Sequence, residues 1–429
     1  MRIAVYGLWH LGCVTAGCLA AAGHRVIGLD RNEAVVADLQ KSVPPLHEPG
    51  LAELIASGLK EGRLSFTTDP AAALRDAELL WIAFDTPVDD RDQADVSFVR
   101  QELEAIVHAI PRGTLVLNSS QVPVGFTRGL MHDWQERGLR FAYSPENLRL
   151  GKALDCFRKA ERVIVGMGAE ADKPTLAALH GPFCQRIEWM SVESAEMTKH
   201  ALNAFLATSV TFINEVARLC EAVGADAKEV ECGLKSEARI GPKAYLSPGA
   251  AFAGGTLARD VRFLVDFGGR YRVNTPLFAG VLKSNDVHKN WVDDKVRQLL
   301  DTAAQPVVAV LGLTYKPGTS TLRRSAAVEL CNRLNAQGVR IRAHDPAVRT
   351  LPQELGRTVV LCQSPQEALA GADVAVVATE WPDYKSLRAQ QVVDLMRRPQ
   401  VIDQNHYLAE FLAGDARITY IATGKAGAL

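Results

Sequence analysis

Two glycines and an aspartate near the N-terminus have the types and spacing of a dinucleotide-binding turn. The segment Gly7-Leu8-Trp9-His10-Leu11-Gly12 follows a short apolar run, and Asp30 comes 18 residues after Gly12. In such a unit the first glycine permits a tight turn, the second lets a pyrophosphate approach and the third lets the helix pack on the strand. An acid at the position of Asp30 would bind both ribose hydroxyls, which favours NAD over its 2′-phosphorylated form, although the neighbouring Arg31 weakens that preference.

The middle glycine of this pattern is replaced by Trp9. A side chain at that position either points away and covers the turn, so that NAD still binds, or crowds the cofactor and changes how it is held. We expect the turn residues to contact the cofactor: Gly7, Trp9, His10, Leu11 and Gly12.

The elements that must position these residues are alternating strands and helices. Strand-like runs at 2–6, 25–29, 79–84, 114–120, 140–144 and 161–167 are separated by helical stretches, and the alternation restarts at 306. Such alternation predicts βαβ units and a mainly parallel sheet. The two halves form a loose repeat in which the second strand ends in an acid, Asp30 or Asp345.

Between the halves, a helical pattern without internal Gly or Pro runs from Ser194 to about Gly224. Its length indicates a helix that spans two domains or builds an oligomer interface. The prediction is an α/β protein with two doubly wound Rossmann-like domains joined by a long central helix and a helical middle domain. The expected bounds are 1–190, 191–300 and 301–429.

The composition is that of an ordinary globular chain. The 429 residues include 48 Lys and Arg against 49 Asp and Glu, which gives a net charge of −1. This balance argues against a nucleic-acid or anionic-membrane partner. Eight cysteines without a CxxC pair predict reduced, mostly buried thiols, and no apolar run is long enough to cross a membrane. We expect a cytoplasmic protein without a metal site.

Seven motifs in order make the chain similar to the UDP-glucose/GDP-mannose dehydrogenase family. They are the turn at 7–12, Asp85-Thr86-Pro87, Ser120-Gln121-Val122-Pro123-Val124-Gly125, Ser144-Pro145-Glu146-Asn147-Leu148-Arg149-Leu150-Gly151, Lys199 with Asn203, the segment 247–260 from Ser247 to Asp260, and the segment from Tyr315 to Ser325. The resemblance covers nearly the full length.

The resemblance implies oxidation of the C6 alcohol of a nucleotide sugar to a carboxylate. In the family two hydride transfers to NAD pass through a cysteine thiohemiacetal and thioester. Lys199, Asn203, Asp260 and Glu146 match family active-site residues. The spacing of Lys199 and Asn203 places both on one helix face, where they could polarise one substrate oxygen or a water molecule.

Three positions depart from the family pattern. The family's nucleophilic cysteine aligns with Thr256, its second glutamate with Leu150, and its catalytic threonine with Gln121. A threonine hydroxyl needs a dedicated base, whereas a thiol is partly ionised at neutral pH. We therefore expect hydride transfer without the thioester step.

The remaining matches concern ligand binding. The resemblance assigns further cofactor contacts to Thr86, Pro87, Ser120 and Arg323. It assigns substrate contacts to Asn147, Leu148, Arg149, Arg239, Lys243, Tyr245, Phe252, Gly254 and Lys316. Backbone amides of the Gly-rich loop 247–255 could hold a diphosphate, while Arg and Lys neutralise its charge. For His10 and His200 a hydrogen-bonded structural role is favoured over acid–base chemistry.

Several functions stay open at this point. The leading hypothesis is an NAD-dependent oxidoreductase acting on a nucleoside-diphosphate sugar, with a UDP-sugar favoured, that stops at the aldehyde or oxidises a hydrated aldehyde. The alternatives are a redox-neutral epimerase that retains NAD, and a non-catalytic nucleotide-sugar-binding protein. The family and the long helix together predict a homodimer or higher homo-oligomer.

Overall fold

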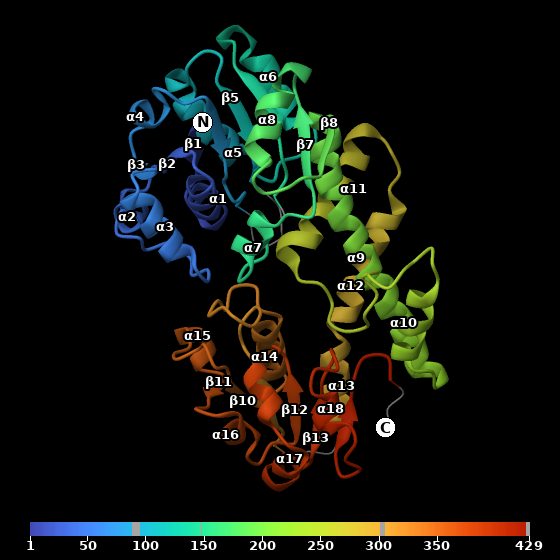
Figure 1. Ribbon diagram of the computed structural model, residues 1–429. Helices are drawn as coiled ribbons and strands as arrows, with labels where there is room; N and C mark the ends of the chain where they lie inside the picture. The colour runs from blue at the N-terminus through green and yellow to red at the C-terminus, as the bar shows by residue number, and fades with distance from the viewer. Residues whose placement is uncertain (88–94, 147, 301–304, 426–429) are drawn as a thin grey trace. The chain divides into compact units, whose positions relative to one another are not determined.

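The chain folds into two compact units, Met1–Leu202 and Asn203–Leu429 (Figure 1). The structure, a computed structural model, describes residues 1–87, 95–146, 148–300 and 305–425. Each unit contains its own sheet flanked by helices. This confirms the α/β architecture with two Rossmann-like sheets and a helical middle.

The first unit is built on an eight-stranded sheet with the order β3-β2-β1-β4-β5-β6-β7-β8. All neighbouring strands are parallel except β6 and β7, which are antiparallel. The strands are β1 Arg2–Tyr6, β2 Arg25–Leu29, β3 Leu64–Thr67, β4 Leu79–Ile82, β5 Leu115–Asn118, β6 Arg140–Tyr143, β7 Val163–Met167 and β8 Ile187–Ser191. The order of the first six strands is that of a doubly wound dinucleotide fold, in which ligands bind where the order reverses, between β1 and β4.

Helices cover both faces of this sheet, because its central strands are apolar on both sides. Ile3 and Val5 of β1 pack into one buried cluster, whereas Ala4 and Tyr6 pack into another, as the alternation of side chains along a strand requires. The helices are α1 His10–Ala21, α2 Glu33–Leu39, α3 Leu51–Lys60, α4 Pro70–Leu74, α5 Val96–Ile106, α6 Phe126–Asp133, α7 Ala153–Arg158, α8 Lys173–His180 and α9 Val192–Val223.

The second unit contains a six-stranded, fully parallel sheet with the order β11-β10-β9-β12-β13-β14. Its strands are β9 Val307–Leu311, β10 Arg340–His344, β11 Val359–Leu361, β12 Val374–Val377, β13 Gln400–Ile402 and β14 Thr419–Ile421. Its helices are α10 Ala227–Ser236, α11 Arg259–Tyr271, α12 Pro276–Lys289, α13 Trp291–Leu300, α14 Ala326–Ala336, α15 Gln353–Gly356, α16 Pro365–Leu369, α17 Ala389–Leu395 and α18 Ala409–Leu412. In chain order this strand arrangement equals that of the first six strands of the other sheet.

The predicted repeat extends to a hydrogen bond at the turn after the first strand of each sheet. In the first unit Leu8 N donates to Asp30 Oδ2 at 2.7 Å. In the second unit Leu313 N donates to Asp345 Oδ2 at 2.8 Å. Each carboxylate therefore fixes the turn at the edge where the strand order reverses.

The two acids differ in what else they bind. Asp345 is buried and also accepts hydrogen bonds from Thr314 and from Trp381 Nε1, at 2.9 and 3.0 Å. Asp30 is half-exposed and accepts one further bond, from Asn32 N at 2.9 Å. The carboxylate of Asp30 can thus reach a ligand, whereas that of Asp345 is used inside the fold.

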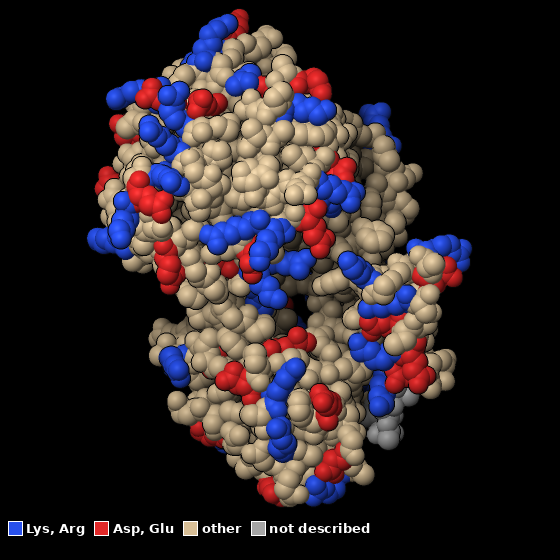
Figure 2. Space-filling view, viewed as in Figure 1, with Lys and Arg blue, Asp and Glu red and all other residues tan. Residues whose placement is uncertain are grey.

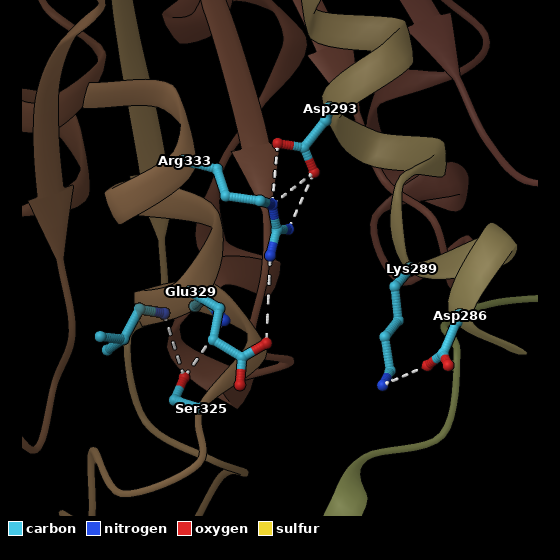
Figure 3. A network of polar contacts seen from close by, with 8 residues as sticks. Asp286, Lys289, Asp293, Ser325, Glu329 and Arg333 are labelled. Carbon is cyan, nitrogen blue, oxygen red and sulfur yellow. Dashed lines mark hydrogen bonds and ion pairs between the residues drawn. The ribbon is translucent and has the colours of Figure 1, made fainter. Parts of the chain in front are cut away.

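An ion-pair network joins the helical part of the second unit to its sheet domain (Figure 3). Arg333 of α14 forms a bidentate pair with the buried Asp293 of α13, with Nη2 2.8 Å from Oδ2, and its other face lies 3.9 Å from Glu329. Ser325 caps the start of α14 by accepting from Ala327 N and Val328 N. The network fixes α14 and hence the end of the preceding loop that carries Arg323.

A second polar cluster ties α10 to the start of the Gly-rich loop. Glu231 of α10 is buried and accepts hydrogen bonds from Lys228, Lys235 and Ser247, at 2.9, 2.5 and 2.6 Å. Burial by itself raises the pKa of the Glu231 carboxyl, but these three bonds outweigh it and lower the pKa to about 2.

The cysteines are free and mostly buried, as the sequence predicts. Six of the eight thiols are buried, and all eight are free. Over the face in Figure 2, Lys and Arg side chains are interspersed with Asp and Glu side chains. Within residues 1–87, 95–146, 148–300 and 305–425, none of the helices is both long and apolar enough to cross a membrane.

The close approach of α1 to the first turn predicts a severe effect of Gly12→Ala. A Cβ atom at Gly12 would lie 1.8 Å from the carbonyl oxygen of Gly7, which is backbone and must move. We expect a loss of about 3 kcal/mol or more in stability, or failure to fold. The matched control is Gly129→Ala in α6, where a Cβ meets nothing within 4 Å. Thermal unfolding should show Gly129→Ala at or slightly above wild type, and equal melting of both variants would contradict the packing.

The cluster around Glu231 predicts a pH-dependent contribution to stability. Because the folded pKa lies below the unfolded value near 4.5, the ionised Glu231 stabilises the protein above about pH 4.5. That contribution is lost as the pH falls from about 4.5 towards 2. Glu231→Gln should destabilise the protein by roughly 1–3 kcal/mol at pH 7, and its deficit relative to wild type should shrink with acid. Chemical unfolding across this pH range measures the difference, with the exposed Glu229→Gln of the same helix as control; a deficit independent of pH would refute the assignment.

Candidate functional site

The loops that follow β4 and β5 are joined at the edge where the strand order of the first sheet reverses. Thr86 Oγ1 donates to the carbonyl oxygen of Gln121 at 2.6 Å, and Phe84 N donates to Ser120 Oγ at 3.0 Å. Thr86 and Ser120 are buried, whereas Pro87 is exposed. The structure thus brings together Thr86 and Ser120, which are predicted cofactor contacts, and Gln121, which is a predicted catalytic position.

The first turn has the backbone shape of a dinucleotide site despite Trp9. Gly7 adopts a positive φ of 95°, and its N–H donates to Leu29 O at 3.0 Å. Trp9 precedes α1 with extended backbone angles, φ −87° and ψ −154°, which any residue adopts. Its side chain is 48% exposed. The tryptophan therefore needs no strained backbone, and Leu11 and Gly12 behind it are buried in the start of α1.

The neighbour of Asp30 is held by an acid on another helix. Arg31 Nη1 lies 3.3 Å from Glu102 Oε1 of α5, and Tyr6 OH donates to Glu102 Oε2 at 2.6 Å. This pairing removes part of the positive charge that Arg31 would offer to a 2′-phosphate. It favours NAD at the half-exposed carboxylate of Asp30.

These features fit the dinucleotide that the sequence predicts. The turn leaves no room for a Cβ at Gly12, the amide-rich start of α1 faces the turn, and an acid lies at the end of β2. When bound, NAD supplies a hydride acceptor. The residues that would hold it are Gly7, Trp9, His10, Leu11, Gly12 and Asp30.

The first unit also places Lys199 beside the segment that carries Glu146. Lys199 of α9 is buried, and its Nζ donates to the backbone carbonyl of Glu146 at 2.6 Å. The Glu146 carboxylate is half-buried and accepts from Leu148 N at 2.5 Å. The ammonium and the carboxylate that the family resemblance singled out are therefore in the same local structure.

Two buried side chains of α9, Glu196 and His200, fix the loop after β5, and sequence reasoning did not single out Glu196. Glu196 accepts from Gly125 N and Thr127 N, at 2.6 and 2.9 Å, and so satisfies the first amides of α6. His200 Nε2 donates to Val122 O at 2.9 Å, in line with the structural role expected for it. Their spacing of four residues, on the helix face that also carries the buried Lys199 and Asn203, is the signal that could have identified them.

In the second unit Asn203 and Asp260 form a buried pair. Asn203 Nδ2 donates to Asp260 Oδ2, and both side chains are buried, Asp260 fully. Asp260 lies in the first turn of α11, directly after a π-helical turn at Gly254–Ala258 that contains the exposed Thr256. Thr256, which the sequence analysis aligns with the family's cysteine, and Asp260 are thus one helical turn apart.

Three side-chain amides and one histidine form hydrogen bonds to the backbone of the Gly-rich loop 247–255. Gly249 N donates to Asn214 Oδ1, Ala250 N to Asn405 Oδ1 and Phe252 N to Asn285 Oδ1, at 2.7–3.0 Å. His288 Nε2 donates to Gly249 O at 2.8 Å.

This support was not expected from the sequence. Its four side chains come from α9, α12 and the segment after β13, and no motif links them. It also means that the amides of Gly249, Ala250 and Phe252 are already used inside the fold. A bound diphosphate would have to use other donors of the loop.

The other predicted contacts, which are to the substrate except for the predicted cofactor contact Arg323, fall into two classes of exposure. Exposed side chains are those of Arg149, Arg239, Lys243, Tyr245 and Arg323; half-buried or buried ones are Leu148, Phe252 and Lys316. Arg239 is paired with Glu237 at 2.9 Å. Gly254 lies in the π-helical turn, and Asn147 lies outside the described residues.

Three family models together match most of the chain. The NAD binding domain of the UDP-glucose/GDP-mannose dehydrogenase family matches residues 1–184, its central domain 193–287 and its UDP binding domain 309–410.

Curated relatives match at full length. A UDP-glucose 6-dehydrogenase of Bacillus subtilis is 33% identical over 433 residues, covering 99% of this chain and 98% of that protein. The UDP-glucose 6-dehydrogenase of Pseudomonas aeruginosa is 32% identical, with 99% and 98% covered.

A solved structure of the same family also matches nearly the full chain. A UDP-glucose dehydrogenase from Pyrobaculum islandicum is 31% identical, with a TM-score of 0.84 and 95% of each chain covered. The chain thus belongs to the UDP-glucose/GDP-mannose dehydrogenase family, a family of NAD-dependent oxidoreductases that act on the CH–OH group of nucleotide sugars.

Proposed function

We propose that the protein oxidises the C6 hydroxyl of a UDP-hexose with NAD and does so without a cysteine thioester. The observation that supports this proposal is a contact in each unit: Lys199 donates to the backbone of Glu146, and Asn203 donates to Asp260. The exposed Thr256 is the residue that the sequence motif aligns with the family's cysteine. The relatives that share its full length are named for UDP-glucose, which supports that sugar nucleotide as the first substrate to test.

In this proposal Lys199 and Glu146 handle the proton of the first oxidation. The C6 hydroxyl gives up its proton as the hydride, with its electron pair, leaves C6 for the cofactor. The Lys199 ammonium stabilises the oxygen as negative charge develops. The half-buried carboxylate of Glu146 accepts the proton, directly or through water. Lys199 Nζ donates to the Glu146 carbonyl in the structure. The substrate oxygen must therefore take the place of that carbonyl before the ammonium can stabilise it.

The second oxidation proceeds through water. A water molecule held by the Asn203 amide and the Asp260 carboxylate adds to the aldehyde carbon; Asp260 takes the water proton and returns it to the former carbonyl oxygen, which completes the gem-diol. The gem-diol gives up its C6 hydride, for which a second NAD would be the acceptor, and one hydroxyl proton to Asp260, and so becomes the carboxylic acid, with its new oxygen from water. The exposed Thr256 hydroxyl takes no nucleophilic part, and Gln121 lies in the loop where the family has a threonine.

We assign the ligands to the domains as the family models do, with separate NAD binding and UDP binding domains. We infer domains at 1–190, 191–300 and 301–429, with NAD in the first and the UDP moiety in the third. The basic residues Arg239, Lys243 and Lys316 are proposed to neutralise the diphosphate, and Arg323 to contact the cofactor. Tyr245, Phe252 and Gly254 are proposed to line the sugar nucleotide, with Asn147, Leu148 and Arg149.

We also propose that α9 forms the core of a homodimer in the cytoplasm. Phe205, Phe212 and Leu219 of the second unit are spaced by seven residues and are 68%, 48% and 66% exposed, and Val223 is 77% exposed. Seven-residue spacing places these side chains on one helix face. A continuous apolar stripe of this kind is typical of a surface that a second copy covers.

The count of reduced cofactor tests the proposed reaction. With purified protein, NAD and UDP-glucose, we expect two NADH and one carboxylate product per sugar, measured by absorbance and product mass. One NADH with an aldehyde product would overturn the hydration step. No NADH with an altered sugar would indicate an epimerase, and binding without turnover would indicate a non-catalytic protein; both contradict the proposal.

A Thr256→Cys variant serves as the mechanistic control. A thiol at this position should speed the second oxidation relative to wild type and make the enzyme sensitive to inactivation by iodoacetamide, whereas Thr256→Ala should leave the rate unchanged. Slowing of the reaction by more than tenfold in Thr256→Ala, with the rate kept in Thr256→Ser, would show that the hydroxyl takes part.

Charged substitutions on α9 test the dimer. Phe212→Asp combined with Leu219→Asp should convert the dimer to a monomer at micromolar concentration, because burying two carboxylates in an apolar interface costs several kcal/mol, on the order of what holds such a contact. Val360→Asp, at a 60% exposed position on β11, is the control. Light scattering after size exclusion gives the mass; an unchanged dimer in the double variant would contradict this interface.

A further inference from the structure

A single buried carboxylate joins three segments of the first unit. Glu48, in the connection between α2 and α3, is 3% exposed. Its Oε2 accepts from His10 Nε2 at 2.9 Å and from Gly151 N at 2.8 Å, and its Oε1 accepts from Ala153 N at 2.8 Å. His10 is the first residue of α1, and Ala153 is the first residue of α7.

The partners of Glu48 lie in the two regions of the unit for which ligand contacts are predicted. His10 lies in the dinucleotide turn, directly after Trp9. Gly151 ends the segment 144–151 that carries Glu146, and Gly151 turns with a positive φ of 84°. Glu48 is therefore the hydrogen-bonded link from the cofactor turn to the segment that positions Glu146.

The charge on Glu48 is set by these same contacts. Burial raises the pKa of the carboxyl, but the bonds from His10, Gly151 and Ala153 outweigh it, and the pKa lies below its ordinary value. An ionised carboxylate only accepts hydrogen bonds, so His10 Nε2 carries a proton in this pair. All three partners are donors, and an amide side chain, which has two donor hydrogens of its own, could not replace the carboxylate.

α7 packs on the core of the unit, but a cavity lies beside it. Ala153 and Leu154 are buried in that core, and Phe157 packs against it. A cavity of about 80 Å³, lined among others by Thr15, Phe157 and His180, lies beside α1, α7 and α8. Thr15 Oγ1 and His180 Nε2 are buried and have no hydrogen-bond partner among the described residues. The two backbone hydrogen bonds to Glu48 therefore add to the packing that fixes the start of α7.

We propose that Glu48 is a positioning residue that transmits occupancy of the dinucleotide turn to the segment carrying Glu146. It touches neither substrate nor cofactor. It holds Gly151 and α7 through its two oxygens, and it is itself held at the turn by His10. The inference rests on the proposed roles of the turn and of Glu146, but its structural readout requires no turnover.

Hydrogen exchange of the full-length protein tests the link. In Glu48→Gln, the amides of Gly151 and Ala153 should exchange at least tenfold faster than in wild type. Added NAD should slow exchange across 148–158 in wild type and have less than half that effect in Glu48→Gln. A purely structural role would raise exchange by the same factor with and without NAD, and that result would overturn the proposal.

A double-mutant cycle separates the partners. With NAD at a concentration that saturates each variant, as measured by calorimetry, His10→Phe should lose the same NAD-linked protection, and the double variant should add nothing to Glu48→Gln, because both remove one connection. Additive effects would show that His10 is not part of the link. The control is Glu53→Gln, an exposed position on α3, which should exchange like wild type. If UDP-glucose is not oxidised and the exchange pattern nevertheless holds, the proposed reaction fails and this inference stands.

Should Glu48→Gln fail to fold, Glu48→Asp replaces it. The shorter carboxylate keeps the charge but cannot span all three donors at 2.8–2.9 Å. It should speed exchange at Gly151 and Ala153 less than tenfold and still weaken the NAD effect. Full retention of the NAD effect in Glu48→Asp would contradict the proposal.

Discussion

The hydrogen bond from the turn after the first strand to a carboxylate at the end of the second strand is the contact on which the first unit depends. Leu8 N and Asp30 Oδ2, 2.7 Å apart, fix the turn. The fixed turn in turn sets where α1 begins. Gly12 can then pack against the carbonyl of Gly7, and His10 is placed where it reaches Glu48. The predicted cofactor turn and the segment that ends at Gly151 are therefore connected by a short chain of hydrogen bonds.

The second unit uses the same contact for a different purpose. Asp345 makes the equivalent bond to Leu313, but Thr314 and Trp381 also donate to it, and it is buried. Its carboxylate has become part of the core. Two sheets with the same strand order therefore offer different surfaces at their crevices, which agrees with family models that assign NAD to one and UDP to the other.

Within each unit, buried polar side chains from α9 or α12 support the loops that carry predicted ligand contacts. Glu196 and His200 hold the loop after β5, while Asn214, Asn285 and His288 hold the Gly-rich loop. A backbone that is hydrogen-bonded from behind keeps its shape before any ligand arrives, which is the condition for electrostatic preorganisation. Thr256, which the sequence motif aligns with the family's cysteine, follows the hydrogen-bonded Gly-rich loop directly in the chain.

The sequence by itself determined the fold class, the repeat and the family, because these depend on local signals. Apolar runs ending in Gly7 and Asp30, the long helix at α9, and the ordered motifs are all read along the chain. The tertiary structure decided which polar groups meet. The link through Glu48 joins residues 38 and 103 positions apart, and Asn405 reaches Ala250 across 155 positions. No periodicity or motif records such pairings, since they arise only when the parallel sheets bring distant loops to a common edge.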